Sequence, residues 1–405
     1  MKKYLVVLYI IFSTILFGKA NFKSGLDVFV EGEYKNYIGK NIAIITNITG
    51  ITSDEIQNVD ILREKGLNIV KLFGPEHGIR GNVQAGEKIV DGIDKNTGIP
   101  VYSLYGKTKK PTKEMLNNVD VLIYDIQDIG SRSYTFISTM AYCMQEASKY
   151  NIEFIVLDRP IALNGNIVDG NILENDYSSF IGLYPIAYVY GMTCGELAGY
   201  INNEFGINCN LKVVKMNGYS HNMDYDDTGL EWKAPSPNIP DVESAYLYPA
   251  TGIIGELGTL TGGAGIGKMF KYLGEPSMNS KKLVEYLNSK NIQGVYFENI
   301  EFTPTLGKYQ NKKCNGIALN IVDKTKIRPF ETTIYIMEAL YKLYPDKNYL
   351  GRKNDVGNKS MFEKAIGTEK IRKLIFEGKS SEEIIESYKE DLDSFKIKRK
   401  KYLLY

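Results

Sequence analysis

Five short apolar runs, with polar or helical segments between them, constrain the fold of this chain more than any other feature. The runs span residues 41–46, 67–72, 119–124, 152–157 and 211–214. Each is apolar almost throughout, which is typical of a strand that is covered on both faces. We therefore expect them to form the strands of one buried, mostly parallel sheet.

Helical patterns follow several of these runs, at residues 53–65, 134–150 and 193–204. The last of them starts at Thr193, and Glu196 three residues later completes the pattern of a capping box. Strands that alternate with helices predict an α/β fold in which helices cover both faces of the sheet.

A proline-rich segment ends this alternation. Residues 234–240 have the sequence Ala-Pro-Ser-Pro-Asn-Ile-Pro, which neither a helix nor a central strand accommodates. We place a domain boundary near Tyr246, so that one domain spans residues 21–245 and a second spans residues 246–405. The second domain contains strand-like and amphipathic helical patterns at residues 294–297, 316–322, 329–344, 369–377 and 380–393.

The N-terminus has the pattern of a secretory signal peptide. Lys2 and Lys3 precede an uncharged run at residues 4–17, and Gly18-Lys19-Ala20 places small residues where signal peptidase recognises them. The run is shorter than the roughly 20 residues that a membrane-spanning helix needs. We therefore favour cleavage after residue 20 over a permanent anchor, and we expect a periplasmic or extracellular mature chain without a membrane span.

The charge balance and the cysteines argue against several classes of function. Lys and Arg total 49 and Asp and Glu total 48, so no net charge favours binding to nucleic acid. The four cysteines include no Cys-x-x-Cys pair, and the chain has only two histidines, so we expect no metal site. Export permits a disulfide, but a chain of this length does not need one, and we favour buried free thiols. The oligomeric state stays open.

The peptide Gly-Pro-Glu-His-Gly-Ile-Arg-Gly at residues 74–81 is the strongest candidate for chemistry. It follows the second apolar run and sets Glu76, His77 and Arg80 between glycines. Glycine permits a tight turn that holds polar side chains toward a ligand. The plainer interpretation is a surface turn in which Glu76 and Arg80 pair with each other.

Polar residues also follow the other predicted strands. Asn47 follows the first strand, residues 125–134 follow the third, and Asp158-Arg159-Pro160 follows the fourth. The carboxyl ends of parallel strands open on one edge of a doubly wound sheet. We therefore expect these residues to converge with Glu76 on one cleft.

Each of these residues also has a structural interpretation. The alternatives are helix caps for Asp125 and Asp128, an ion pair for Asp158 with Arg159, a turn for Asn47, and helix packing for Tyr134. His221 lies in a polar stretch, and we expect it at the surface.

Taken together, these stretches resemble the bacterial exo-β-N-acetylmuramidase family. The resemblance covers nearly the whole mature chain and rests on motifs at residues 74–81, 85–88, 97–106, 125–134, 157–160, 182–186, 191–197 and 235–240. It implies a Rossmann-like catalytic domain that carries the active-site cleft, beside a smaller C-terminal α+β domain. It also implies an enzyme that removes N-acetylmuramic acid from the non-reducing ends of peptidoglycan fragments, with Glu76 at the position proposed as catalytic in the family.

The chain departs from the family pattern at residues 260–265. The family usually has Leu-Ser-Glu-Gly-Arg-Gly there, whereas this chain has Leu-Thr-Gly-Gly-Ala-Gly, without the acid and the guanidinium. This departure keeps a second hypothesis open, a non-catalytic cell-wall saccharide-binding protein on the same scaffold. A nucleotide-binding protein is disfavoured, because Met269 stands where a phosphate-binding loop needs Ser or Thr.

Glycoside hydrolysis needs an acid that protonates the leaving oxygen and a group that stabilises or traps the positive centre. We expect Glu76, with His77 beside it, to be the proton donor, because burial in a cleft raises the pKa of a carboxyl group. Asp125 or Asp128 then activates water, acts as a nucleophile or orients the acetamido group of the sugar. The sequence does not distinguish these three roles.

N-acetylmuramic acid carries a lactyl carboxylate, for which Arg80, Arg132 or Arg159 offers a planar, two-pronged donor. The expected substrate-binding residues are Asn47, Arg80, Gln127, Arg132, Tyr134, Asp158, Arg159, Asn164, Ser236 and Asn238. We expect peptidoglycan-derived saccharides as partners, and neither a metal nor a cofactor.

Overall fold

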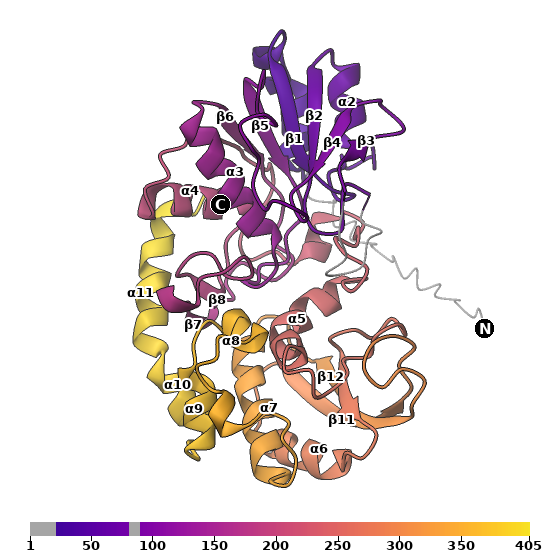
Figure 1. The fold of residues 1–405 in the computed structure, drawn as a ribbon, viewed down its shortest axis with the longest axis vertical. Coiled ribbons are helices and arrows are strands. Elements are labelled where there is room, and N and C mark those ends of the chain that lie inside the picture. The colour runs from indigo at the N-terminus through magenta and orange to yellow at the C-terminus, as the bar shows by residue number, and fades with distance from the viewer. Residues whose placement is uncertain (1–21, 81–89) are drawn as a thin grey trace, which may run out of the picture.

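The computed structural model describes residues 22–80 and 90–405, and its first half is built around a seven-stranded sheet (Figure 1). The strands are β1 (Asn41–Thr46), β2 (Asn68–Gly74), β3 (Gly92–Ile93), β4 (Pro100–Ser103), β5 (Val121–Asp125), β6 (Glu153–Leu157) and β9 (Leu211–Val214). Their order is β3-β4-β2-β1-β5-β6-β9, and every pairing is parallel except that of β3 with β4. The predicted mostly parallel sheet is confirmed. The predicted signal peptide and the motif at residues 85–88 lie outside the described residues.

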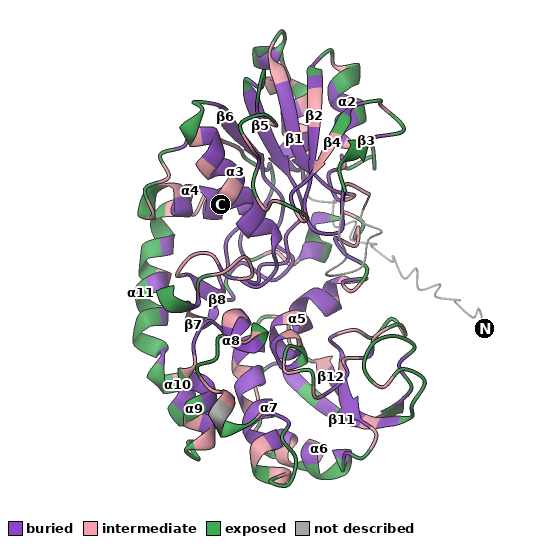
Figure 2. Cartoon of the chain, in the orientation of Figure 1, coloured by how far each residue is buried: buried purple, intermediate pink, exposed green. Residues whose placement is uncertain are grey.

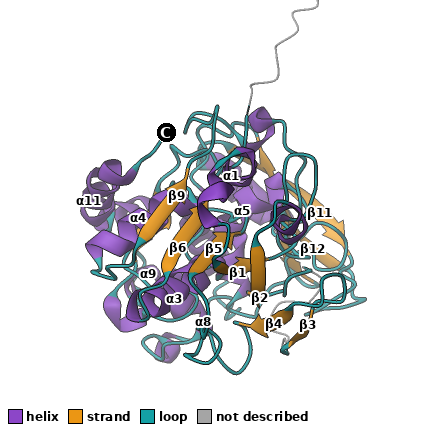
Figure 3. Cartoon of the chain, turned by 90° about the horizontal axis from the view of Figure 1, so that it is seen from above, coloured by secondary structure: helices purple, strands orange, loops and turns teal. Residues whose placement is uncertain are grey.

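Helices cover both faces of this sheet, as predicted. They are α1 (Gly25–Glu31), α2 (Asn58–Glu64), α3 (Phe136–Lys149) and α4 (Cys194–Glu204). Ile42 and Ile44 of β1 share a core with α1 and α2, whereas Ala43 and Ile45 share a larger core with α3 and α4. This alternation follows from the two-residue period of a strand. Figure 3 shows the strands in order between the two layers of helices, and Figure 2 shows how thoroughly the central strands are buried.

The second half combines an antiparallel sheet with helices, as the resemblance implies. The sheet has the order β10-β12-β11, with β10 (Tyr272–Glu275), β11 (Val295–Phe302) and β12 (Cys314–Ile321). Its helices are α5 (Val242–Gly255), α6 (Ser280–Ser289), α7 (Pro329–Leu343), α8 (Met361–Ile366), α9 (Lys370–Phe376), α10 (Ser381–Ser387) and α11 (Lys389–Arg399). A short antiparallel pair, β7 (Asp169–Ile172) and β8 (Ala187–Val189), lies against α7 and α11 and ties the two halves together.

Helix α5 shows how packing overrides a local signal. It begins directly after the proline-rich segment and continues through Pro249, although proline removes a helix hydrogen bond. The helix packs along α7, and the Thr333 hydroxyl group donates to the carbonyl oxygens of Pro249 and Ala250. Tyr246, where we placed the domain boundary, lies inside this helix.

The helix predicted at residues 380–393 is two helices in the structure, α10 and α11, which meet at Tyr388. The Tyr388 ring is buried and packs edge-on against Phe330 of α7, with the ring centroids 5.9 Å apart. We attribute the break to this packing. Helix α11 then runs back toward α4 (Figure 1).

Within residues 22–80 and 90–405, no helix is both long and apolar enough to cross a bilayer. The four cysteines are buried free thiols in the structure.

Candidate active site

A cleft of about 540 Å³ lies between the carboxyl end of β2 and the second half of the chain. Its polar lining consists of Glu76, His77, Tyr105, Ser133, Tyr134, Thr135, Ser236, Asn238, Thr251, Glu256, Thr261 and Lys308. Aromatic and aliphatic side chains form the rest of the wall. This volume and this mixture of side chains are typical of small-molecule sites, whose volumes are roughly 300–1,000 Å³.

Glu76 is held at the wall of the cleft by hydroxyl groups. Its side chain is buried, and Thr135, directly before α3, donates a 2.7 Å hydrogen bond from Oγ1 to Glu76 Oε2. Tyr105 also lines the cleft and interacts with Glu76. Burial raises the pKa of the Tyr105 hydroxyl group, and the negative charge of Glu76 and a hydrogen bond with it raise that pKa further. The carboxyl group of Glu76 is therefore fixed in one orientation.

The turn that presents Glu76 has a strained backbone. His77 has a φ of 70° and Gly78 a φ of 71°, and the amide of Gly78 donates to the carbonyl oxygen of Pro75 at 3.0 Å. A left-handed conformation is unfavourable for a residue other than glycine, and such strain is typical of functional sites. The His77 ring packs edge-on against Phe136 of α3, with centroids 6.5 Å apart, and this packing holds the turn.

Aromatic rings form the apolar side of the cleft. Tyr134 and Phe270 both lie edge-on to Tyr248, with centroid distances of 5.7 Å and 4.9 Å. Behind them, the Ser133 hydroxyl group hydrogen-bonds the hydroxyl groups of Tyr188 at 2.6 Å and Tyr248 at 3.1 Å. These edge-to-face rings give this side of the cleft an apolar lining.

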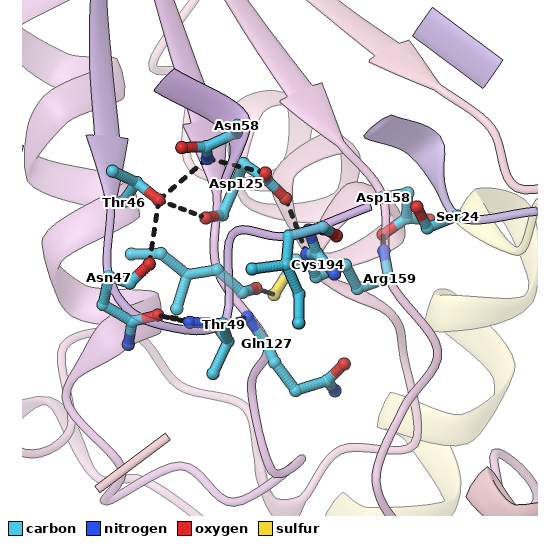
Figure 4. Close-up of polar contacts among 12 residues, drawn as sticks. Ser24, Thr46, Asn47, Thr49, Asn58, Asp125, Gln127, Asp158, Arg159 and Cys194 are labelled. Carbon is cyan, nitrogen blue, oxygen red and sulfur yellow. Dashed lines mark hydrogen bonds and ion pairs between the residues drawn. The ribbon is translucent and has the colours of Figure 1, made fainter. Parts of the chain in front are cut away.

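In open α/β sheets, ligands usually bind where the strand order reverses, here between the carboxyl ends of β1 and β5. In this protein, a cluster of hydrogen-bonded side chains lies at that edge of the sheet (Figure 4). Asp125 at the end of β5 accepts hydrogen bonds from Arg159 Nε at 2.6 Å and from Asn58 Nδ2 at 2.7 Å, and no part of Asp125 is exposed. Asn47 is equally buried, and its Oδ1 accepts from the backbone and the hydroxyl group of Thr49.

Asp128 lies in a separate buried environment. Its Oδ2 accepts hydrogen bonds from the amide of Gly130, at 2.7 Å, and from the hydroxyl group of Tyr190. Burial raises the pKa of Asp128 to about 6, against the lowering effect of these two donors. Neither Asp125 nor Asp128 lines the cleft, which corrects the expectation that they face the same hollow as Glu76.

The guanidinium group of Arg132 binds backbone rather than the cleft. It is completely buried and donates to the carbonyl oxygens of Asn171, Ile186 and Ile366 at 2.7–2.8 Å. Since Ile366 ends α8, Arg132 connects the two halves of the chain.

The other two arginines are also engaged away from the cleft. Arg80 pairs with Asp94 at 2.6 Å, rather than with Glu76. Arg159 pairs with Asp125 and lines a second cavity of about 220 Å³, together with Gln127. The structure thus does not bring the three predicted guanidinium groups to the cleft.

Asp158 organises the start of α4 rather than pairing with Arg159. It accepts hydrogen bonds from the hydroxyl groups of Thr193 and Tyr405 and from the amide of Gly195. Thr193 and Glu196 form the predicted capping box.

His221 is buried, which corrects the expectation of a surface position. Its Nε2 lies 2.8 Å from Glu196 Oε1, and this contact ties residues 218–222 to α4. Asn164 lies nearby and donates from its backbone to the Tyr246 hydroxyl group.

The structure therefore collects five of the predicted residues on one cleft: Glu76, His77, Tyr134, Ser236 and Asn238. The remaining nine lie elsewhere: Asn47, Arg80, Asp125, Gln127, Asp128, Arg132, Asp158, Arg159 and Asn164.

Sequence reasoning did not identify Tyr105, Tyr248, Glu256 or Lys308 as site residues. Tyr105 is the second-last residue of the motif at 97–106, whereas Glu256 follows a helix that the proline-rich segment concealed. Among the described residues, no group of three or more His, Cys, Asp or Glu side chains is arranged to hold a metal ion.

Comparison with known families matches both halves of the chain. Residues 42–243 match the N-terminal domain, and residues 246–405 the C-terminal domain, of the family described as exo-beta-N-acetylmuramidase NamZ.

Individual proteins are similar over almost their full length. The peptidoglycan beta-N-acetylmuramidase NamZ of Bacillus subtilis (strain 168) is 46% identical over 389 residues, which cover 96% of this chain and 92% of that protein. Crystal structures of two DUF1343 family proteins from Bacteroides fragilis NCTC 9343 have TM-scores of 0.89 and 0.77, with 41% and 33% identity. Each comparison covers 95% of this chain and 99% of the other.

Proposed function

The chain belongs to the exo-β-N-acetylmuramidase NamZ family, and on this basis we propose that it is an exo-acting glycoside hydrolase that releases N-acetylmuramic acid from the non-reducing ends of peptidoglycan fragments. The observation that carries this proposal is the cleft between the two halves, where Glu76 is buried beside aromatic rings. The predicted family is confirmed.

Glu76 is the general acid in this proposal. Protonation of the glycosidic oxygen requires a carboxyl group that is held within hydrogen-bonding distance of the leaving group. The hydroxyl groups of Thr135 and Tyr105 supply that fixed orientation.

The lactyl carboxylate of the sugar requires a cation at the cleft. Lys308 is the cation among the described residues that line it. Its ammonium group is exposed and contacts the carbonyl oxygen of Gly258. Because a lysine side chain is long and flexible, its ammonium group can turn toward a bound carboxylate. We assign lactyl recognition to Lys308 in place of the three arginines.

Hydrolysis of two chromogenic substrates tests the proposed function. We expect the enzyme to release 4-nitrophenol from its β-N-acetylmuramide and much less from the β-N-acetylglucosaminide. Glu76→Gln should lower kcat on an N-acetylmuramyl disaccharide by at least about 100-fold while the circular dichroism spectrum stays unchanged. Unaltered turnover would refute the role of Glu76, and absence of release from any muramide would refute the function.

A saccharide-binding protein without turnover is the second candidate. One observation favours it: Gly262 and Ala264, which replace the usual acid and guanidinium, both line the cleft. The same assay distinguishes the two functions, because a pure binder is stabilised against heat by the muramide but releases no 4-nitrophenol.

We also propose that the chain is exported. The pattern of residues 1–20 supports export. N-terminal sequencing of the secreted or periplasmic protein should begin at Asn21, and retention of the uncleaved chain in the cytoplasm would contradict this.

A further inference from the structure

We propose that Glu256 is the second catalytic carboxylate of the cleft and acts as the base that activates the attacking water. This inference rests on the proposed function, because it completes the reaction that Glu76 begins. Glycosidases of this type use a pair of carboxyl groups. Among the described residues that line the cleft, the acids are Glu76 and Glu256.

The helix geometry points Glu256 into the cleft. Five residues at the end of α5 line the cleft: Tyr248, Thr251, Gly252, Gly255 and Glu256. Their spacing of three, one, three and one residues is that of a single face of an α-helix. Glu256 caps α5 at its C-terminus, so its side chain continues this face. Gly252 and Gly255 have no side chains, so this face of the helix leaves room for a ligand next to the carboxylate.

The two acids come from different segments of the chain and differ in exposure. Glu76 follows β2 and is buried, whereas Glu256 follows α5 and remains open to the solvent in the cleft. No cation within the described parts of the chain forms a salt bridge with Glu256. A carboxylate that is solvent-accessible, unpaired and close to a buried acid is suited to accept a proton from water.

The electrostatics of the cleft couple Glu256 to Glu76. Partial burial raises the pKa of Glu256, and the negative charge of Glu76 raises it further. The other titratable groups that feel the charge of Glu256 are Tyr105, Tyr188 and Tyr248. A base is most effective when its pKa lies near the working pH, so the direction of this shift favours catalysis.

In the proposed step, one proton enters the leaving group and one leaves the water. Glu76 gives its proton to the glycosidic oxygen as the bond from that oxygen to C1 breaks. The water oxygen forms the new bond to C1, and its proton passes to the Glu256 carboxylate. The products are N-acetylmuramic acid and the shortened saccharide, and no further reactant is needed.

The departure at residues 260–265 fits this assignment. Gly262, Ala264 and Glu256 all line the cleft. The cleft therefore has an acid a few residues earlier in the chain, although the acid of the usual motif is absent.

Substrates with good and poor leaving groups test the role of Glu256. A good leaving group needs no proton, so loss of an acid is partly hidden, whereas loss of a base is not. We expect Glu256→Gln to lower kcat at least about 100-fold on both the 2,4-dinitrophenyl muramide and the N-acetylmuramyl disaccharide. Glu76→Gln should be impaired mainly on the disaccharide. Sodium azide or formate should restore turnover of the dinitrophenyl substrate by Glu256→Ala.

Glu285→Gln, an exposed acid on α6, is the matched control and should keep wild-type rates. Thermal unfolding checks that every variant folds. If Glu256→Gln retains wild-type kcat while the wild type hydrolyses muramides, the inference fails and the proposed function stands. If Glu256→Gln is impaired only on the disaccharide, Glu256 is an acid and the base assignment is overturned. If the wild type releases nothing, both proposals fail.

Discussion

Arg159 and Asp125 form a buried ion pair, in which Arg159 Nε lies 2.6 Å from Asp125 Oδ1 at the carboxyl edge of the sheet. Burial alone would lower the pKa of the guanidinium group, but the charge of Asp125 outweighs it, so the pKa of Arg159 is raised. Arg159 also donates to the carbonyl oxygen of Ile51. The pair therefore joins the ends of β5 and β6 to the loop after β1, in the crevice where related folds hold a ligand.

Removing one partner of this pair should destabilise the fold. Arg159→Met leaves the Asp125 carboxylate buried without its cation, and we expect a loss of about 3–5 kcal/mol in the free energy of unfolding. Adding Asp125→Asn to this variant should cost less than the sum of the single changes, because the two side chains are coupled. Urea unfolding of the single and double variants measures this.

The exposed ion pair of Lys313 and Glu301 is the matched control. Removing this pair should lower the free energy of unfolding by less than about 1 kcal/mol. If Arg159→Met is as stable as the wild type and instead loses affinity for muramides, the substrate-binding role predicted from the sequence would be correct.

The sheet was predictable because its strands are buried on both faces and are therefore apolar throughout. Short strands such as β4 and β10 carry no such signal, since they are partly polar and depend on their neighbours in the sheet. Helix α5 was concealed because the proline-rich segment before it and Pro249 within it both argue locally against a helix, and packing against α7 overrides them.

The site was predictable only in part, for a related reason. Strand topology determines which edge of the sheet Asp125 and Glu76 occupy, but the side chains of other segments decide which of them faces a cavity. Asn58 of α2 and Arg159 cover Asp125, whereas Thr135 holds Glu76 at an open wall. Glu256 had no local motif, because it reaches the cleft only through the packing of the second half.

Asp128 should make stability depend on pH. Its pKa is about 6 in the folded protein and 3.8 when unperturbed, so folding favours the protonated form. The contribution of Asp128 to the free energy of unfolding is therefore fully present below about pH 4. It is lost as the pH rises through 6, and the total loss is about 3 kcal/mol. Asp128→Asn cannot titrate, so the stability of the wild type relative to this variant should fall from pH 4 to pH 7.

Urea unfolding at several pH values measures this difference. Asp346→Asn, at an exposed acid, is the control for the loss of one negative charge. A difference for Asp128→Asn that does not change with pH would mean that Asp128 titrates normally in the folded protein.

The C-terminal residue should contribute to stability. The Tyr405 hydroxyl group donates to Asp158 Oδ2 at 2.8 Å and accepts from the amide of Met216 at 2.9 Å. Tyr405→Phe leaves the Asp158 carboxylate and the Met216 amide without this partner. We expect the free energy of unfolding to fall by about 1–3 kcal/mol. Tyr402→Phe removes only a bond to the exposed Glu204 and should cost much less. If thermal unfolding shows equal losses of stability for the two variants, the contact with Asp158 contributes no more than the exposed contact of Tyr402.

Lys308 should determine the preference for a lactyl group. If its ammonium group pairs with the lactyl carboxylate, Lys308→Met should weaken inhibition by free N-acetylmuramic acid about 10-fold and leave inhibition by N-acetylglucosamine unchanged. A charge-assisted hydrogen bond contributes roughly 1.5–3 kcal/mol, which is consistent with that factor. Lys312→Met, at an exposed lysine in the same loop, is the control. An equal effect on both inhibitors would assign Lys308 to general positioning of the loop.

Gly255 offers a test of whether substrate occupies the cleft at all. A Cβ atom built on Gly255 has no other atom within 4 Å, and the residue belongs to the face of α5 that lines the cleft. Gly255→Leu should therefore project into the space for the sugar without disturbing the core. We expect kcat/KM for muramides to fall at least 10-fold, while stability is unchanged or slightly higher, because replacing glycine within a helix lowers the entropy of the unfolded chain. Gly32→Leu, where a Cβ is equally unhindered but distant from the cleft, should retain full activity. Full activity of Gly255→Leu would mean that the sugar binds elsewhere, and the second cavity beside Arg159 would become the next place to test.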